Sequence, residues 1–135
     1  MNLIVCLDNK NGMLFNKRRQ STDRKLCSHL LAFVGERLLW MNAQTASQFS
    51  DLPASVKVAE DFLALAAETD YCFVEDPAWE KYAADVQEIV VYRWNRIYPA
   101  DTRFPASELE RRKLVSRVDF AGFSHERITQ EIYCI

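Results

Sequence analysis

Residues 3–7 read Leu3-Ile4-Val5-Cys6-Leu7, an unbroken apolar run near the start of the chain. Two of these residues are β-branched and no polar position interrupts the run, which is typical of a β-strand buried on both faces. Strands of this kind lie inside parallel sheets that helices cover on both sides. The run therefore predicts an α/β protein with a parallel sheet that helices cover.

The segment after this strand, residues 8–22, carries almost no periodic apolar signal. It contains the turn formers Asn9, Asn11, Gly12 and Asn16. Residues of these types favour turns and irregular backbone over regular elements. We therefore predict a long loop here, of the kind that often carries function.

A helix is predicted between this loop and Gly35, because apolar residues recur there at helical spacing. These residues are Leu26, Leu30, Leu31, Phe33 and Val34. Thr22 or Asp23 is suited to cap the start of the helix, and Gly35 to end it. The helix is long enough to cover one face of the sheet.

Strands and helices continue to alternate along the chain. Strands are predicted at residues 37–41, 56–58, 71–74, 88–94, 113–120 and 127–134, and helices at 44–50, after Glu60-Asp61 and from Pro77 onward. The last two strands are joined by residues 121–126 and form an antiparallel hairpin. This order predicts one domain over residues 1–135, an α/β fold with a doubly wound, mostly parallel sheet, helices on both faces and an antiparallel C-terminal hairpin.

Composition indicates an ordinary globular protein. Hydrophobic residues make up 49% of the chain, charged residues 27%, and the net charge is −2. The chain starts without a basic leader, and the first apolar run is too short for a signal peptide or a membrane span, so we expect a cytoplasmic protein with no membrane partner. The four cysteines are widely spaced and are expected to be reduced core residues, with no metal site.

Three stretches, taken together, resemble the dihydrofolate reductase family. They are Ile4-Val5-Cys6-Leu7-Asp8 followed by Asn11-Gly12-Met13, then Leu38-Leu39-Trp40-Met41 followed by Thr45, and Ala100-Asp101-Thr102-Arg103-Phe104-Pro105. The last stretch is the most specific of the three. The resemblance implies a reductase-like fold and gives Gly12, Thr45 and Thr102 as cofactor-binding positions.

The sequence departs from this family where the cofactor phosphates would bind. Asn42 and Ala43 replace a glycine and an arginine, which removes the guanidinium that would hold a phosphate. Glu75-Asp76-Pro77 stands in place of a Gly-Gly pair, so carboxylates occupy a helix start that would otherwise attract an anion. We therefore expect no cofactor, with NADP as the alternative.

The rest of the ligand cleft follows from the same comparison. Asn42, Asp76, Pro77 and Tyr92 are expected to line it, and Tyr92 stands where the family has a threonine that contacts the pterin. Asp23 corresponds to the family's pterin-binding acid, and helix capping is the competing interpretation of this residue. The family's Gly-Gly peptide is cis, which implies a cis Asp76-Pro77 bond here.

Other chemistry has less support in the sequence. Only His29 and His125 could act as a base beside a nucleophile, and their places in a helix and a hairpin turn favour packing roles. Basic residues cluster at 17–19, 24–25 and 111–113, which offers nucleotide or RNA binding as a hypothesis, although the net charge argues against a nucleic-acid partner.

We therefore predict a reductase-like binding or interaction module that has lost the usual NADPH and folate residues and takes a small-molecule or nucleotide ligand. A divergent oxidoreductase that uses a nicotinamide cofactor and retains Asp23 as its acid is the alternative. Binding of nucleotides or RNA through the basic clusters is a second alternative. A homodimer formed through an exposed edge strand is a further hypothesis, because unpaired backbone groups invite a partner.

Overall fold

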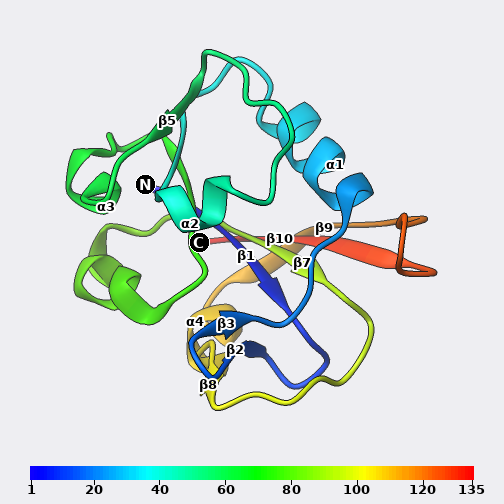
Figure 1. The fold of residues 1–135 in the computed structure, drawn as a ribbon. Coiled ribbons are helices and arrows are strands. Elements are labelled where there is room, and N and C mark those ends of the chain that lie inside the picture. Colours follow the sequence, from blue (N-terminus) through cyan, green and yellow to red (C-terminus); the bar gives the residue numbers. More distant parts are fainter.

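A computed structural model describes all residues 1–135, and its centre is a seven-stranded mixed sheet (Figure 1). The strand order is β5-β4-β6-β1-β7-β10-β9. The strands are β1 (Asn2–Leu7), β4 (Leu39–Met41), β5 (Val56–Val58), β6 (Tyr71–Phe73), β7 (Ile89–Arg93), β9 (Lys113–Phe120) and β10 (Ile128–Cys134). The first five in the sheet order pair in parallel, and the last two form an antiparallel hairpin beside β7. This confirms the predicted mostly parallel sheet and its C-terminal hairpin.

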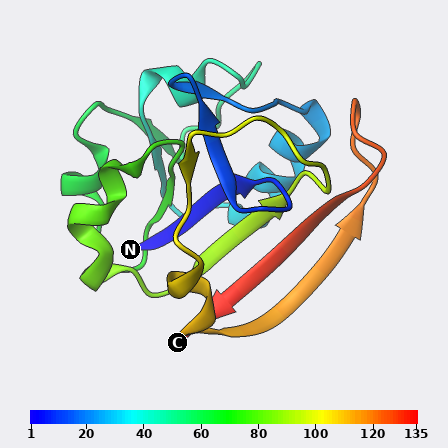
Figure 2. The same cartoon turned by 90° about the horizontal axis from the view of Figure 1, so that it is seen from below.

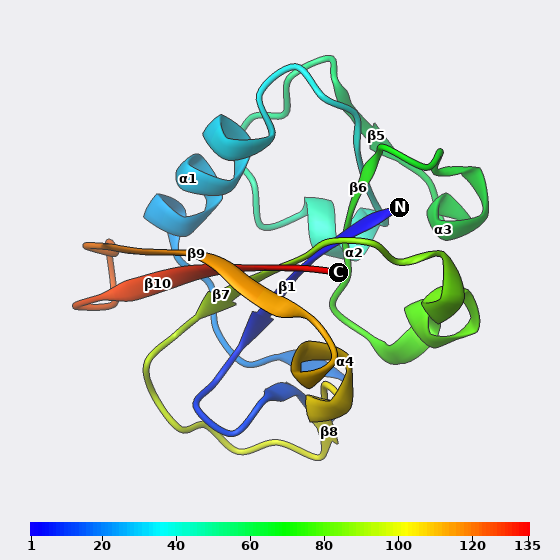
Figure 3. The ribbon, with the colours of Figure 1, turned by 180° about the vertical axis from the view of Figure 1, so that it is seen from behind.

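Strand β1 occupies the middle of the sheet because its side chains are apolar on both faces. Leu3 and Val5 belong to one buried cluster and Ile4 to the other. Helix α1 (Arg24–Val34) contributes buried side chains to the cluster of Ile4, whereas α3 (Phe62–Leu65), the 3₁₀ helix η1 (Pro77–Asp85) and α4 (Ala106–Glu110) contribute to the other. Seen from behind, α1 lies away from α4 across the sheet (Figure 3).

The predicted loop at residues 8–22 is wrong in part, because it contains β2 (Gly12–Phe15) and β3 (Arg18–Arg19). These strands join β8 (Thr102–Arg103) in a separate small sheet of order β3-β2-β8. The turn between them has positive φ at both Asn16 and Lys17, the backbone of a tight hairpin turn. Such turns usually contain glycine, and its absence here hid the hairpin.

Helix α1 was predicted correctly, with Asp23 as its N-cap and Gly35 at its end in a positive-φ conformation. The helix expected at 44–50 is the shorter α2 (Ala43–Ala46), and α4 was not predicted. The helix from Pro77 is present as η1. Five residues offer too little periodicity to reveal α4 from sequence.

The expected cis bond between Asp76 and Pro77 is wrong, because all peptide bonds are trans. Asp76 has an extended backbone, which is the conformation favoured before proline. Its carboxylate accepts a hydrogen bond from the Ala78 amide at 2.9 Å. The segment therefore starts η1 through an ordinary cap.

The C-terminal hairpin of β9 and β10 extends along one border of the molecule (Figure 2). Its tip meets the start of α1, where the Phe123 and Ser124 amides donate to Asp23. Strand β9 is the sheet edge, and its Leu114, Val115 and Val118 side chains are exposed. A register shift in its pairing with β10 marks a bulge. The homodimer stays a prediction.

Two further expectations concern the cysteines and the membrane. All four cysteines are unpaired; Cys27 and Cys72 are buried as expected of core residues, whereas Cys6 and Cys134 are only partly buried. Desolvation raises the pKa of Cys27 to about 11 and that of Cys72 to about 12. None of the helices combines the length and the apolar character that crossing a membrane requires.

Candidate functional site

A polar pocket of about 580 Å³ lies where β4 and β6 end. It is lined by Leu14, Asn16, Lys17, Arg19, Asn42, Gln44, Thr45, Glu75, Asp76, Pro77, Asp101 and Thr102. Open α/β sheets bind ligands at the carboxyl ends of their strands, and this volume is that of a small-molecule site. We call it the polar pocket.

The structure brings five of the sequence-predicted site residues together in this pocket. They are Asn42, Thr45, Asp76, Pro77 and Thr102. They come from three segments that are far apart in the chain: the start of α2, the start of η1, and β8. Their convergence comes from the parallel strands, whose ends meet at one edge of the sheet, and from the small sheet that forms the opposite wall.

Two helix starts face the polar pocket, and side chains of the same chain already occupy their amides. Asn42 accepts a hydrogen bond from the Thr45 amide at 2.9 Å, and Asp76 accepts one from Ala78. The Ala43 amide donates to Glu60 at 3.1 Å. These amides are therefore not free for the phosphate of a ligand, although free helix-start amides are what normally attract one.

The charges of the pocket also disfavour an anion. Glu75, Asp76 and Asp101 contribute three carboxylates, against the two cations Lys17 and Arg19. The Arg19 guanidinium is already paired, since its Nε lies 3.0 Å from Glu75 Oε2 and its second donor lies 3.1 Å from Glu75 Oε1. Both side chains are largely buried. The pocket therefore suits a neutral or cationic polar ligand.

The wall opposite the helix starts is built by the small sheet. Thr102 pairs with Leu14 across β8 and β2, and Asp101 accepts a hydrogen bond from the Asn16 amide at 3.0 Å. This bond ties the tight turn of the β2–β3 hairpin to the segment that resembles the reductase family most closely. The turn residue Lys17 thereby lies at the pocket.

Two other predicted residues, Gly12 and Tyr92, do not line the polar pocket. The Gly12 amide donates to Asp8 at 2.8 Å, and a Cβ at Gly12 would lie 2.6 Å from an Asp8 oxygen. Tyr92 is fully buried, and its hydroxyl contacts Gln130 at 3.0 Å and His29 at 2.9 Å. Gly12 thus permits a close approach of segments, and Tyr92 belongs to the core.

A second group of polar residues forms at the start of α1, around His125. His125 Nδ1 lies 2.9 Å from Asp23 Oδ2, and its Nε2 lies 3.1 Å from Ser21 Oγ and 3.0 Å from the Tyr98 hydroxyl. The imidazole stacks on Trp94 with ring centres 4.6 Å apart. We call Ser21, Asp23 and His125 the histidine cluster.

Asp23 serves this cluster and caps the helix at the same time. Its carboxylate is fully buried. Its donors are the amides of Lys25, Leu26, Phe123 and Ser124, the Ser124 hydroxyl and His125. Burial alone would raise the pKa of Asp23, but the hydrogen bonds, chiefly from the Phe123 amide and His125, hold it well below its ordinary value. A carboxyl that stays ionised at neutral pH has no proton to donate.

Sequence reasoning missed the histidine cluster because 102 residues separate Asp23 from His125. We expected His125 to have a packing role, and its stacking on Trp94 is such a role. Its hydrogen bonds to Asp23 and Ser21 were not expected. His29 matches its expected packing role, since it stacks on Phe120 at 4.1 Å, and burial lowers its pKa. The sequence offered only two hints of the cluster: Ser21 and Asp23 lie two residues apart, and the chain has only two histidines that could join them.

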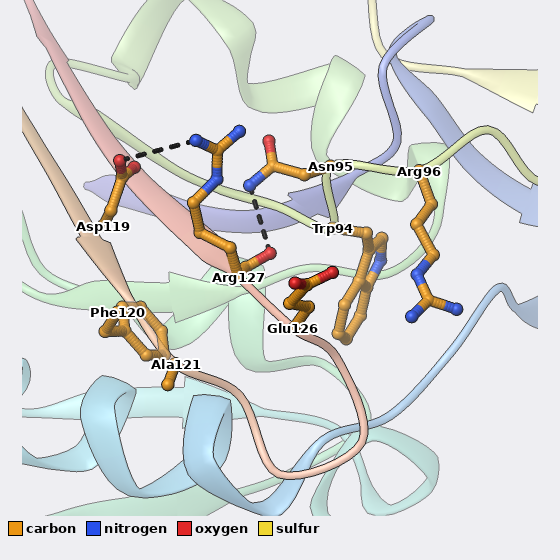
Figure 4. A pocket seen from close by; sticks show the side chains of 8 residues that line it. All are labelled: Trp94, Asn95, Arg96, Asp119, Phe120, Ala121, Glu126 and Arg127. Atoms are coloured by element: carbon orange, nitrogen blue, oxygen red, sulfur yellow. Dashed lines mark hydrogen bonds and ion pairs between the residues drawn. The ribbon is translucent and has the colours of Figure 1, made fainter.

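A second cavity, of about 640 Å³, is lined by Trp94–Arg96 and by residues at the end of β9 and the start of β10 (Figure 4). The Arg127 guanidinium lies 3.9 Å from Asp119, and the Asn95 side chain donates to the Arg127 carbonyl at 3.1 Å. Arg96 and Glu126 add one charge of each sign. This cavity contains none of the predicted site residues, and its charges balance, so it gives no preference for a ligand class.

No family model matches this sequence, and no curated protein matches it. The fold and the polar pocket therefore define a class and no more: an α/β protein with a ligand-sized pocket at the carboxyl ends of a mostly parallel sheet. The resemblance to dihydrofolate reductase rests on the quoted residues alone.

Proposed function

We propose that this protein is a dihydrofolate reductase-like binding module that holds a small, polar, unphosphorylated molecule of about nucleoside size in the polar pocket. The observation that carries the proposal is the convergence on this pocket of residues from the stretches that resemble the family. The lining contains one residue from each of the three stretches, or from the position directly after it: Leu14, Thr45 and Thr102.

The loss of NADP binding is supported by the capped helix starts and by the pairing of Arg19 with Glu75. A bound phosphate would have to displace the Asn42 carboxamide and the Asp76 carboxylate from helix-start amides, and the Glu75 carboxylate from the Arg19 guanidinium. Charge-assisted hydrogen bonds of this kind are among the stronger ones in proteins. A neutral ligand leaves them intact and can use the remaining polar groups of the pocket.

The loss of folate chemistry is supported by the surroundings of Asp23. This carboxylate is covered by the tip of the β9–β10 hairpin and by His125. A pterin would need this acid to face the ligand. The oxidoreductase alternative, which depends on Asp23 as an acid, therefore has less support than the binding module.

The RNA-binding alternative has less support because two residues of the basic clusters are engaged inside the protein. Arg19 pairs with Glu75, and Arg112 is buried, with hydrogen bonds to the carbonyls of Val86 and Gln87. A guanidinium held in this way does not face a phosphate backbone. The remaining cations are spread over the surface.

Thermal stability in the presence of ligands tests the proposal, because a ligand that binds only the folded state raises the melting temperature. The probes are adenosine, guanosine, cytidine and uridine, each compared with its 5′-monophosphate, together with NADPH, NADH, dihydrofolate and a short single-stranded RNA. We expect at least one nucleoside to raise the melting temperature more than its monophosphate. A response confined to NADPH and dihydrofolate would favour the oxidoreductase, and a response to RNA alone the second alternative.

A pair of variants locates the binding site. Thr102→Val removes a hydroxyl from the polar pocket, and Thr69→Val removes one from an exposed position outside it. We expect the first variant to weaken nucleoside binding and the second to leave it unchanged. Equal binding by both variants would place the ligand elsewhere.

A further inference from the structure

The histidine cluster has the connectivity of a nucleophilic serine site. The chain Ser21 Oγ to His125 Nε2 to His125 Nδ1 to Asp23 Oδ2 is continuous, with distances of 3.1 Å and 2.9 Å. Serine, histidine and aspartate joined in this order define such sites on unrelated folds, whatever their order in the sequence. We propose that Ser21 is the nucleophile of an esterase site that hydrolyses esters of small acyl groups.

The tautomer of the neutral His125 imidazole follows from its neighbours. Asp23 is ionised and accepts hydrogen bonds only, so the proton of the neutral imidazole lies on Nδ1. Nε2 therefore has its one lone pair within hydrogen-bond distance of two hydroxyls, those of Ser21 and Tyr98, and accepts from Ser21 when Tyr98 turns away. A base in this state can remove the hydroxyl proton as the oxygen attacks, and Asp23 stabilises the imidazolium that forms.

The base and the acid are held rigidly, whereas the nucleophile is reachable. The side chains of His125 and Asp23 are 3% and 0% exposed, and His125 is stacked on Trp94. Gly122 at the hairpin tip allows the close approach, because a Cβ there would lie 2.8 Å from Asp23 Oδ2. Ser21 is only partly buried and lies on the connection between β3 and α1. A substrate can therefore reach Ser21 without any opening of the core.

The space beside Ser21 limits the acyl group. A cavity of about 10 Å³ adjoins this serine, and its lining combines Cys6, Met13, Val74 and Trp94 with Gln20 and the Arg19–Glu75 ion pair. That volume is roughly one water-sized sphere, which matches a methyl group. The site therefore suits acetyl esters, with the alcohol portion left outside the cavity.

The reaction that these groups support is ordinary ester hydrolysis in two steps. Ser21 Oγ bonds to the acyl carbon while its proton moves to His125 Nε2, and the ester C–O bond then breaks as the alcohol leaves with that proton. Water next gives a proton to Nε2 and bonds to the acyl carbon. The bond to Ser21 breaks, Oγ takes the proton back, and the carboxylic acid is released.

Tyr98 has a defined place in this scheme. Its hydroxyl lies 3.0 Å from the same Nε2 atom. Once Nε2 has accepted the serine proton, the Tyr98 hydroxyl can no longer donate to it and is free to donate to the oxyanion on the acyl group. A donor to the oxyanion typically contributes about 10²-fold or more to the rate.

The test uses the full chain with an ethyl fluorophosphonate probe and with p-nitrophenyl acetate. We expect mass spectrometry to find the phosphonyl adduct on Ser21 and steady turnover of the acetate. Ser21→Ala should abolish the adduct and lower turnover by at least about 10²-fold. Ser28→Ala, a change at an exposed serine of α1 that bonds only to the Arg24 carbonyl, should leave both unchanged.

Two further measurements complete the test. Tyr98→Phe should keep the adduct and slow turnover, and p-nitrophenyl butyrate should be a poorer substrate than the acetate. Melting temperatures of Ser21→Ala and wild type should agree, which separates lost chemistry from lost folding. A folded wild-type protein whose Ser21 stays unlabelled, or a Ser21→Ala protein that keeps full turnover, would overturn the proposal.

Discussion

The Nδ1 atom of His125 lies 2.9 Å from Oδ2 of Asp23, so the hairpin that ends the sheet is fastened to the N-cap residue of helix α1. The hairpin and the helix are distant in sequence, and this bond joins them together with the Phe123 and Ser124 amides. Arg24 adds to the junction, because its guanidinium lies 4.2 Å from the ring centre of Phe123. Asp23 is therefore a structural joint as well as a cap.

Replacement of Asp23 by alanine should destabilise the protein strongly. The change removes the helix cap and leaves the Phe123 and Ser124 amides and His125 without their acceptor. A lost cap costs about 1 kcal/mol, and a buried donor left unpaired costs about 1–3 kcal/mol. We expect the free energy of unfolding in urea to fall by roughly 3 kcal/mol. Asp51→Ala, a change at an exposed aspartate, is the control. Equal losses in both variants would contradict the claim that Asp23 links the hairpin to helix α1.

The pH dependence of stability should reveal the same carboxylate. Its pKa is depressed in the folded protein, so the unfolded chain binds the proton more readily. The stability from Asp23 is therefore complete above the unfolded pKa of about 4 and is lost as the pH falls toward the depressed folded value. Urea unfolding from pH 6 down to pH 2 should show this decline, and Asp23→Ala should decline less steeply than wild type. Parallel curves would be the contrary result.

The charge of the polar pocket should control its choice between nucleosides and nucleotides. Glu75→Gln removes one carboxylate and frees the Arg19 guanidinium that it holds. Because a hydrogen bond to a charged group contributes about 1.5–3 kcal/mol, we expect the affinity for a nucleoside monophosphate to rise about tenfold or more. Calorimetry measures this change, with Glu36→Gln at an exposed site as the control. An unchanged preference would show that Glu75 does not exclude phosphate.

The tight turn of the β2–β3 hairpin should accept glycine with a gain in stability. Lys17 has φ of 62°, a region that costs a side-chain-bearing residue about 1 kcal/mol and costs glycine little. Lys17→Gly also creates the Asn-Gly pair that such turns favour. We expect the free energy of unfolding to rise by roughly 0.5–1 kcal/mol. Lys10→Gly, at a position without positive φ, should not stabilise the protein, and a loss on Lys17→Gly would contradict the account.

The sequence predicted those elements whose signal is local. Leu3–Leu7 revealed a strand buried on both faces because its side chains are apolar throughout, and Asp23 and Gly35 marked the two ends of α1. The β2–β3 hairpin was not predicted, because Asn16 and Lys17 adopt positive φ at its turn and no glycine there indicates such a conformation. The polar pocket was anticipated at Asn42 and Asp76, where parallel strands end.

The histidine cluster could not be predicted, because its geometry is a property of the complete fold. Ser21 and Asp23 lie on one side of a junction whose other side, His125, is placed by the length and twist of the β9–β10 hairpin. No pattern in the sequence fixes where the tip of that hairpin comes to lie. The same holds for Arg19 and Glu75, which meet across the pocket from separate segments.

The capped helix starts mean that the pocket already contains its own substitutes for a phosphate, the Asn42 carboxamide oxygen and the Asp76 carboxylate. Conversion into a dinucleotide carrier would thus require several residues to change together, each intermediate gaining little by itself. Such a requirement would keep the cavity selective for uncharged ligands even after a single substitution.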